Sequence, residues 1–193
     1  MPEKKIIPTF IIQGIVLLIF MKTADFLVLS RPWGLVYFWG IMDNIFHNII
    51  ALIVLLPLYI FCPRLGLLPV IAGGIICSSL DIDHFIAVRS FSLAQVYLNP
   101  CRPWTHSLTF TLICMGGAWI YRKRILDITV VGAALASHVI RDAGMGGCSP
   151  LLFPLPLRSI PEPLYLILVI IIGWSAGLVG LYLGKARGKE NLI

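Results

Sequence analysis

The segment from Leu164 to Leu183 constrains the fold most, because its twenty consecutive residues carry no charged side chain. A helix of that length rises about 30 Å, which is the thickness of the hydrocarbon core of a bilayer. Five further hydrophobic segments precede it, and we predict helices over residues 6–30, 36–61, 65–80, 104–121 and 125–142. The sequence therefore predicts an all-α membrane protein, a polytopic bundle of about six transmembrane helices.

The composition supports this fold class and favours membrane lipid over nucleic acid as the partner. Hydrophobic residues make up 59% of the 193 residues, charged residues make up 12%, and the mean hydropathy is +0.94. A soluble core cannot bury that much apolar surface, so membrane lipid is the predicted partner. The formal net charge of +6 does not indicate nucleic acid, because Lys and Arg fall mostly at the ends of hydrophobic segments. Nothing in the sequence predicts an oligomeric state.

The whole chain, 1–193, is interpreted as a single transmembrane domain. Within it, residues 1–35 form an extra N-terminal helix, 36–160 form the core, and 161–193 form a C-terminal helix with a basic tail. A cleaved signal peptide is the alternative for the first segment, but cleavage after Ala24 would put Lys22 where a small residue is needed. We therefore predict an uncleaved first helix, along which Lys22 and Asp25 are spaced to pair.

Two glycine pairs lie within the predicted helices. They are Gly73–Gly74 and Gly116–Gly117. Because glycine lets two helix backbones approach closely, both pairs predict tight helix packing.

The four histidines all lie at the edges of hydrophobic segments; they are His47, His84, His106 and His138. Counting from the basic turns at Arg64 and Arg122–Arg124, His47, Asp81, His106 and His138 are 14 to 17 residues away. At about 1.5 Å per helical residue, they lie roughly 21–26 Å into a core about 30 Å thick. All four therefore share one depth, near the face opposite the basic turns.

Ionisable groups at membrane depth are costly, so by default they mark a functional site. This set supplies enough nitrogen and oxygen ligands for one or two divalent ions, with zinc as the first choice and manganese or iron as the others. The predicted metal ligands are His47, Asp81, His84, His106, His138 and Asp142. A purely structural polar network is the alternative, and it is most open at His47, which could form only a local pair with Asp43.

Four short motifs follow one another along the core: Asp81-Ile82-Asp83-His84, Cys101-Arg102-Pro103-Trp104-Thr105-His106-Ser107-Leu108, Ser137-His138-Val139-Ile140-Arg141-Asp142, and Pro150-Leu151-Leu152-Phe153-Pro154. In order and spacing, over roughly residues 40 to 160, they resemble the YdjM-like family of membrane-bound metal-dependent hydrolases. The resemblance implies a metal-dependent hydrolase in the inner or plasma membrane, with His47 matching a histidine in an early helix of the family. The link to LexA regulation that the family name records is not carried to this chain.

The chain departs from the family pattern at two places. Cys101 stands where the family has a histidine, and Ala143–Gly147 follows the last aspartate where the family has a threonine. Cys101 is therefore either a thiolate ligand or a loop cysteine with no special role.

The resemblance and the metal prediction together suggest roles for the remaining polar residues. Asp83 is a metal ligand or the general base, and Thr105 supports the ligands by hydrogen bonding. Arg102 and Arg141 either hold an anionic group or anchor the helices at the interface. We predict hydrolysis of a phosphoester or lipid-linked substrate, with Asp83, Thr105 and Arg102 taking part. The alternative is an ion or metal transporter or permease, since intramembrane Asp/His clusters also relay ions.

Charge bias predicts the orientation of the chain in the membrane. With six spans, nine Lys/Arg lie on the side of the termini and the turns at 64 and 122–124, and six lie on the other side. Positive charge favours the cytoplasm, so the site is predicted on the extracytoplasmic face. Cys101 and Cys148 would then meet an oxidising environment and could form a disulfide.

Overall fold

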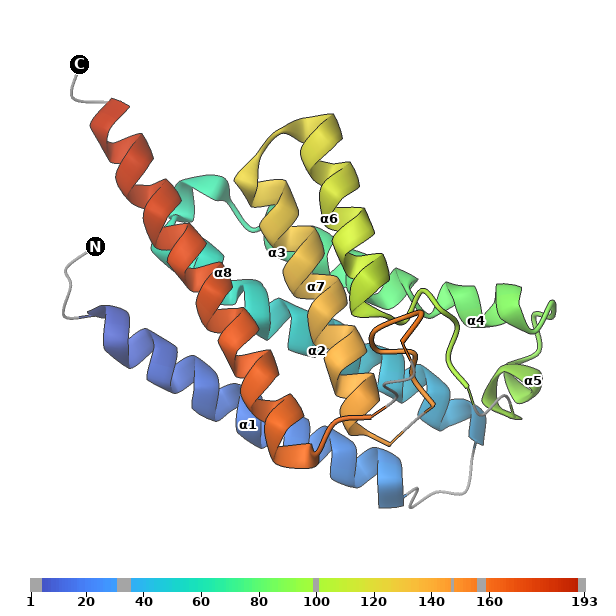
Figure 1. The fold of residues 1–193 in the computed structure, drawn as a ribbon. Helices are drawn as coiled ribbons and strands as arrows, with labels where there is room; N and C mark the ends of the chain where they lie inside the picture. Colours follow the sequence, from blue (N-terminus) through green and yellow to red (C-terminus); the bar gives the residue numbers. More distant parts are fainter. Residues whose placement is uncertain (1–4, 31–35, 99–100, 147, 156–158, 191–193) are drawn as a thin grey trace.

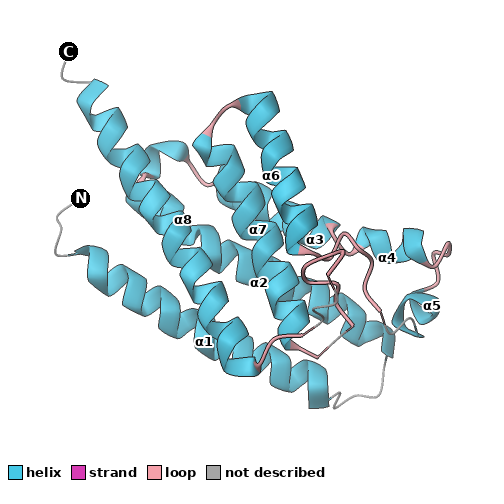
Figure 2. Ribbon diagram, viewed as in Figure 1, coloured by secondary structure: helices cyan, strands magenta, loops and turns pink. Residues whose placement is uncertain are grey.

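The computed structural model describes residues 5–30, 36–98, 101–146, 148–155 and 159–190. Within these ranges the chain is built from helices joined by turns and contains no β-strand (Figure 2). The helices are α1 (Ile6–Ser30), α2 (Val36–Phe61), the 3-10 helix η2 (Pro63–Leu65), α3 (Leu68–Ser79), α4 (Ile82–Ala87), α5 (Leu93–Leu98), α6 (Leu108–Arg122), α7 (Ile125–Gly144) and α8 (Glu162–Glu190). The predicted all-helical bundle is confirmed.

Among the described residues, four helical stretches are long and apolar enough to cross a membrane: Ile6–Ser30, Phe38–Phe61, Leu68–Ala87 and Glu162–Ala186. The third stretch takes in both α3 and α4. Of the other two predicted spans, α6 has only 15 residues, and α7 has 20 but carries Asp127, Arg141 and Asp142. The chain is thus a membrane protein in which α6 and α7 complete a bundle with the four candidate membrane spans.

The helix α2 forms the centre of the bundle, because it packs against α1, α3, α7 and α8 (Figure 1). Its Val54, Leu55 and Leu58 are fully buried, together with Leu17 of α1 and Val169 of α8. The extra N-terminal helix is therefore an integral part of the bundle. α6 packs against α7 as a hairpin whose turn lies far from the short helices α4 and α5.

The two glycine pairs behave differently. A Cβ at Gly73 would lie 2.0 Å from Leu55 Cδ1, and one at Gly74 would lie 3.0 Å from Leu52 Cδ2, so α2 and α3 approach closely at this pair as predicted. The same prediction for Gly116 and Gly117 is wrong, because a Cβ at either position would meet no described atom within 4 Å. The close approach between α6 and α7 is made instead by Gly132, where a Cβ would lie 2.7 Å from Met115 Sδ.

Two helix boundaries differ from prediction near the polar residues. α6 begins at Leu108 rather than Trp104, because Ser107 is its N-cap and accepts a hydrogen bond from the Phe110 N–H. Thr105 and His106 therefore lie in the loop before α6. Between the predicted helices 65–80 and 104–121 the structure contains two further short helices, α4 and α5.

Candidate metal centre

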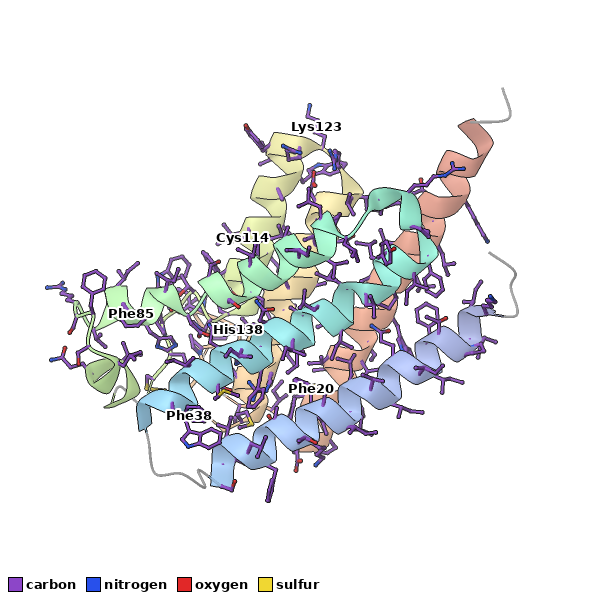
Figure 3. All side chains as sticks on the ribbon, turned by 180° about the vertical axis from the view of Figure 1, so that it is seen from behind. Phe20, Phe38, Phe85, Cys114, Lys123 and His138 are labelled. Atoms are coloured by element: carbon purple, nitrogen blue, oxygen red, sulfur yellow. A yellow bond between two sulfur atoms is a disulfide. The ribbon has the colours of Figure 1, made fainter. Side chains whose placement is uncertain are left out.

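The inner face of α7 provides the first two groups of the centre. His138 and Asp142 are one helical turn apart, so they share a face, and both side chains are about 1% exposed. The closest atoms are His138 Nε2 and Asp142 Oδ2, 3.3 Å apart. Figure 3 shows His138 inside the bundle, well away from Lys123 at the turn between α6 and α7.

A buried histidine of α2 joins this pair. The rings of His47 and His138 stack with their centroids 3.8 Å apart, and His47 Nε2 lies 3.1 Å from Asp142 Oδ1. The ligand atoms of His47, His138 and Asp142 all lie within 4.8 Å of one another, a spacing that could hold a metal ion.

The break between α3 and α4 provides the second group. Asp81 stands at the N-cap position of α4, and His84 lies one turn further on. His106 reaches them from the loop before α6, with its Nε2 3.3 Å from Asp81 Oδ1. The ligand atoms of Asp81, His84 and His106 also lie within 4.8 Å of one another and could hold a metal ion.

The two groups meet in a closed ring of four ligand atoms. Asp81 Oδ1 lies 3.3 Å from both His106 Nε2 and His138 Nε2, and Asp142 Oδ2 lies 3.3 Å from His138 Nε2 and 3.6 Å from His106 Nε2. His138 Nε2 and Asp142 Oδ2 are buried and make no hydrogen bond to any residue that the structure describes. The structure thus brings all six predicted ligands together.

Neighbouring side chains hold the ring members in place. Asn44 Nδ2 donates to Asp81 Oδ2 at 2.6 Å. Asp83 Oδ2 lies 3.1 Å from His106 Nδ1, the imidazole nitrogen that faces away from Asp81. The same Asp83 oxygen accepts a hydrogen bond from the Thr105 hydroxyl. Burial by itself lowers the pKa of His106, but its hydrogen bonds to Asp81 and Asp83 outweigh burial and raise that pKa above the ordinary value.

Arg102 lies at the more open side of the centre. Its Nη2 is 3.0 Å from Asp142 Oδ1, its Nη1 is 3.3 Å from His84 Nε2, and its side chain is 22% exposed. Arg102 therefore carries its charge next to the ligand ring while keeping contact with the surface.

A disulfide between Cys101 and Cys148, which the sequence analysis gave as possible, fixes the segment that carries Arg102. The Arg102 N–H donates to the Cys148 carbonyl at 3.0 Å, and the Ser149 hydroxyl donates to the His106 carbonyl at 3.1 Å. The loop after α7 is thereby fastened along the loop before α6. Because its sulfur is bonded to Cys148, Cys101 is not a thiolate ligand.

The sequence analysis did not predict the position of Arg141. It is fully buried, and it pairs with Asp25 Oδ1 at 3.0 Å and Asp43 Oδ1 at 2.7 Å. Asp25 also accepts a hydrogen bond from the Tyr165 hydroxyl. Held in this way, Arg141 is neither an interfacial anchor nor available to an outside anion. The predicted Lys22–Asp25 pair is also wrong, since Lys22 pairs with Glu162.

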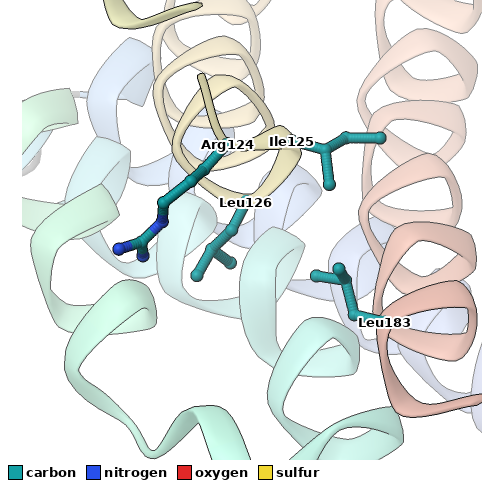
Figure 4. A pocket seen from close by; sticks show the side chains of 4 residues that line it. All are labelled: Arg124, Ile125, Leu126 and Leu183. Carbon is teal, nitrogen blue, oxygen red and sulfur yellow. The ribbon is translucent and has the colours of Figure 1, made fainter. Parts of the chain in front are cut away.

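One surface hollow is unrelated to this chemistry. Arg124, Ile125, Leu126 and Leu183 line it, at the start of α7 and near the end of α8 (Figure 4). It lies at the opposite end of α7 from His138 and Asp142, and none of its lining residues belongs to the centre.

Comparison of the chain with family models, with curated proteins and with solved structures gives no match. The function is therefore argued from the site itself.

Proposed function

We propose that this protein is a membrane-bound metal-dependent hydrolase that cleaves a phosphoester or lipid-linked substrate at the membrane interface. The observation that carries the proposal is the ring of ligand atoms from Asp81, His106, His138 and Asp142, in which imidazole nitrogens and carboxylate oxygens alternate at 3.3–3.6 Å. A cation bound among them would take lone pairs from all four atoms and offset the charge of the two carboxylates.

The balance of charges around the ligand ring favours a bound cation. Among the described residues, five carboxylates lie in this region, and only two guanidinium groups accompany them: Asp25, Asp43, Asp81, Asp83 and Asp142 against Arg102 and Arg141. With neutral histidines, these seven groups carry a net charge of −3, and Asp81 and Asp83 have no ion pair with either arginine. Zinc is the favoured ion for mixed His and Asp ligands, and manganese or iron would also suit them.

The residues present fit a hydrolytic role. A bound divalent ion would lower the pKa of water to about 7 and polarise a phosphoryl oxygen. Asp83 and Thr105 orient His106, while Arg102 can turn its partly exposed guanidinium to an anionic substrate group.

The surface beside the centre suits a substrate with an apolar tail. Ile82 and Ile86 of α4 are 58% and 73% exposed, and Phe91 after it is 96% exposed. These side chains flank Asp81, Asp83 and His84 at the end of a candidate membrane span. A lipid chain can lie against this surface while its head group reaches Arg102.

We place the centre on the extracytoplasmic face of the inner or plasma membrane. The Cys101–Cys148 disulfide supports this placement, because disulfides persist in oxidising compartments. The excess of Lys and Arg at the opposite end points the same way. Membership of the YdjM-like family, suggested by the four sequence motifs, is part of the same proposal.

Transport of an ion or metal is the second candidate, and one observation favours it. α3 ends at Ser79 and α4 begins at Ile82, so the helical stretch is broken next to Asp81. Broken helices carry ion sites in many transporters.

The test incubates detergent-purified, zinc-supplemented protein with mixed phospholipids and a generic phosphoester and measures released products. Hydrolysis should occur, and Asp81→Asn should abolish it. Asp127→Asn, at the distant turn where Asp127 pairs with Arg124, should leave it intact. Cleavage at the wild-type rate in Asp81→Asn would trace the activity to a contaminant. Metal flux into proteoliposomes without cleavage of any substrate would establish the transporter instead.

A further inference from the structure

The six candidate ligands are not equivalent in their surroundings. Metal–ligand bonds of about 2.0–2.2 Å place neighbouring ligands of a tetrahedral ion about 3.3–3.6 Å apart. The four ring contacts among Asp81, His106, His138 and Asp142 are 3.3, 3.3, 3.3 and 3.6 Å. These four contacts therefore have the length expected between adjacent ligands of one ion.

His47 lies outside this ring and has a different partner. Its Nε2 is 2.9 Å from Arg141 Nη1, and because a guanidinium can only donate, this nitrogen accepts. Arg141 cannot move away, since Asp25 and Asp43 hold it in a fully buried position. To bind a second ion, His47 Nε2 would have to give up its hydrogen bond from Arg141.

The two carboxylate oxygens of Asp142 also have different partners. Its Oδ2 belongs to the ring, whereas its Oδ1 faces His47 at 3.1 Å and Arg102 at 3.0 Å. The outer oxygen is thus already neutralised by an arginine, and only the inner one lacks a cationic side chain.

His84 is the other outer histidine. Its Nε2 lies 3.9 Å from Asp81 Oδ1, further than the ring contacts, and 3.3 Å from Arg102 Nη1. Its side chain is 10% exposed, whereas that of His106 is fully buried. His84 therefore shares the open side of the centre with Arg102.

We infer that the centre holds one divalent cation, bound by Asp81, His106, His138 and Asp142, while His47 and His84 are hydrogen-bond partners of the two arginines. The inference rests on the proposed metal-dependent function and reduces the six candidate ligands to four. In this arrangement each arginine holds one outer histidine, and the ion lies among four ligand atoms for which the described contacts include no arginine.

The experiment compares His47→Ala with His138→Ala, because the two rings stack on each other and are equally buried. Metal-stripped protein is loaded with zinc, freed of excess and analysed for metal per chain. Wild type, His47→Ala and His84→Ala should each retain one equivalent, whereas His138→Ala should lose it. With manganese, the electron paramagnetic resonance spectrum should be that of an isolated ion.

Other results would contradict the single-ion inference, the ligand assignment or the proposed function. Two equivalents in wild type, or an exchange-coupled manganese pair, would overturn the single-ion inference and leave the proposed function standing. Loss of metal in folded His47→Ala would make His47 a ligand. If that variant does not fold, His47→Gln replaces it, because its amide oxygen can still accept from Arg141. A wild-type protein that takes up no zinc or manganese would refute the proposed function itself.

Discussion

Each ring nitrogen of His106 lies next to a carboxylate, and the two carboxylates have different roles. Its Nε2 faces Asp81 in the ligand ring, while its Nδ1 lies 3.1 Å from Asp83 Oδ2. A carboxylate in that position fixes the tautomer of a metal-binding histidine and makes it a better ligand. The sequence could not separate this role from direct ligation or general-base chemistry, because Asp81 and Asp83 are only two residues apart.

Asp83→Asn should therefore lower the metal affinity by about 10–100-fold, the usual cost of removing such a partner. Competition with a chelator of known affinity measures the change, with Asp127→Asn as the remote control. Unchanged affinity together with lost turnover would show that Asp83 acts directly on the substrate.

At the scale of the helices, the two ion pairs of α1 differ sharply in burial. Asp25 and Arg141 are 8% and 0% exposed in their side chains, whereas Lys22 and Glu162 are 52% and 57% exposed. Both pairs join α1 to distant parts of the chain, but only the first leaves a buried charge when it is broken.

Asp25→Ala should destabilise the protein by about 3–5 kcal/mol, because Arg141 and the Tyr165 hydroxyl lose a buried partner. Lys22→Ala, the matched control, should cost about 0–1 kcal/mol because water already screens that pair. Reversible unfolding in mixed micelles measures both values. Equal effects of the two substitutions would mean that α1 is not anchored through Asp25.

The helices also show which features can be predicted from sequence. The gathering of His47, Asp81, His106 and His138 could be predicted from their similar distances along the chain to the basic turns, although His106 lies in the loop before α6 and not within a helix. Rotation about the helix axis and the choice of neighbours could not, since packing of the whole bundle sets them. The Asp25–Arg141 pair and the exposed Gly116–Gly117 pair were missed for that reason.

At the scale of the whole molecule, His138 lies well away from the basic turn at Lys123 (Figure 3), and the other ligand residues of the centre lie around His138. The disulfide also lies near the centre, next to Arg102. Orientation in the membrane therefore decides which compartment supplies metal and receives product.

Cys148→Ser frees Cys101, an exposed residue, for a topology test. In intact cells an impermeant thiol reagent should label this variant, because we place Cys101 outside the cytoplasm. Lys123→Cys, in a background that lacks Cys101 and Cys148, should be labelled only after lysis. The reverse pattern would put the centre on the cytoplasmic face.

The link between Asp25 and Arg141 also bears on how the protein is made. The two residues are 116 positions apart, so α1 leaves the ribosome long before its partner is synthesised. During that interval the carboxyl group of Asp25 has no guanidinium to accompany it into lipid. We expect α1 to remain at the insertion machinery until α7 arrives, and chains truncated before Arg141 to be degraded rather than to accumulate as stable fragments.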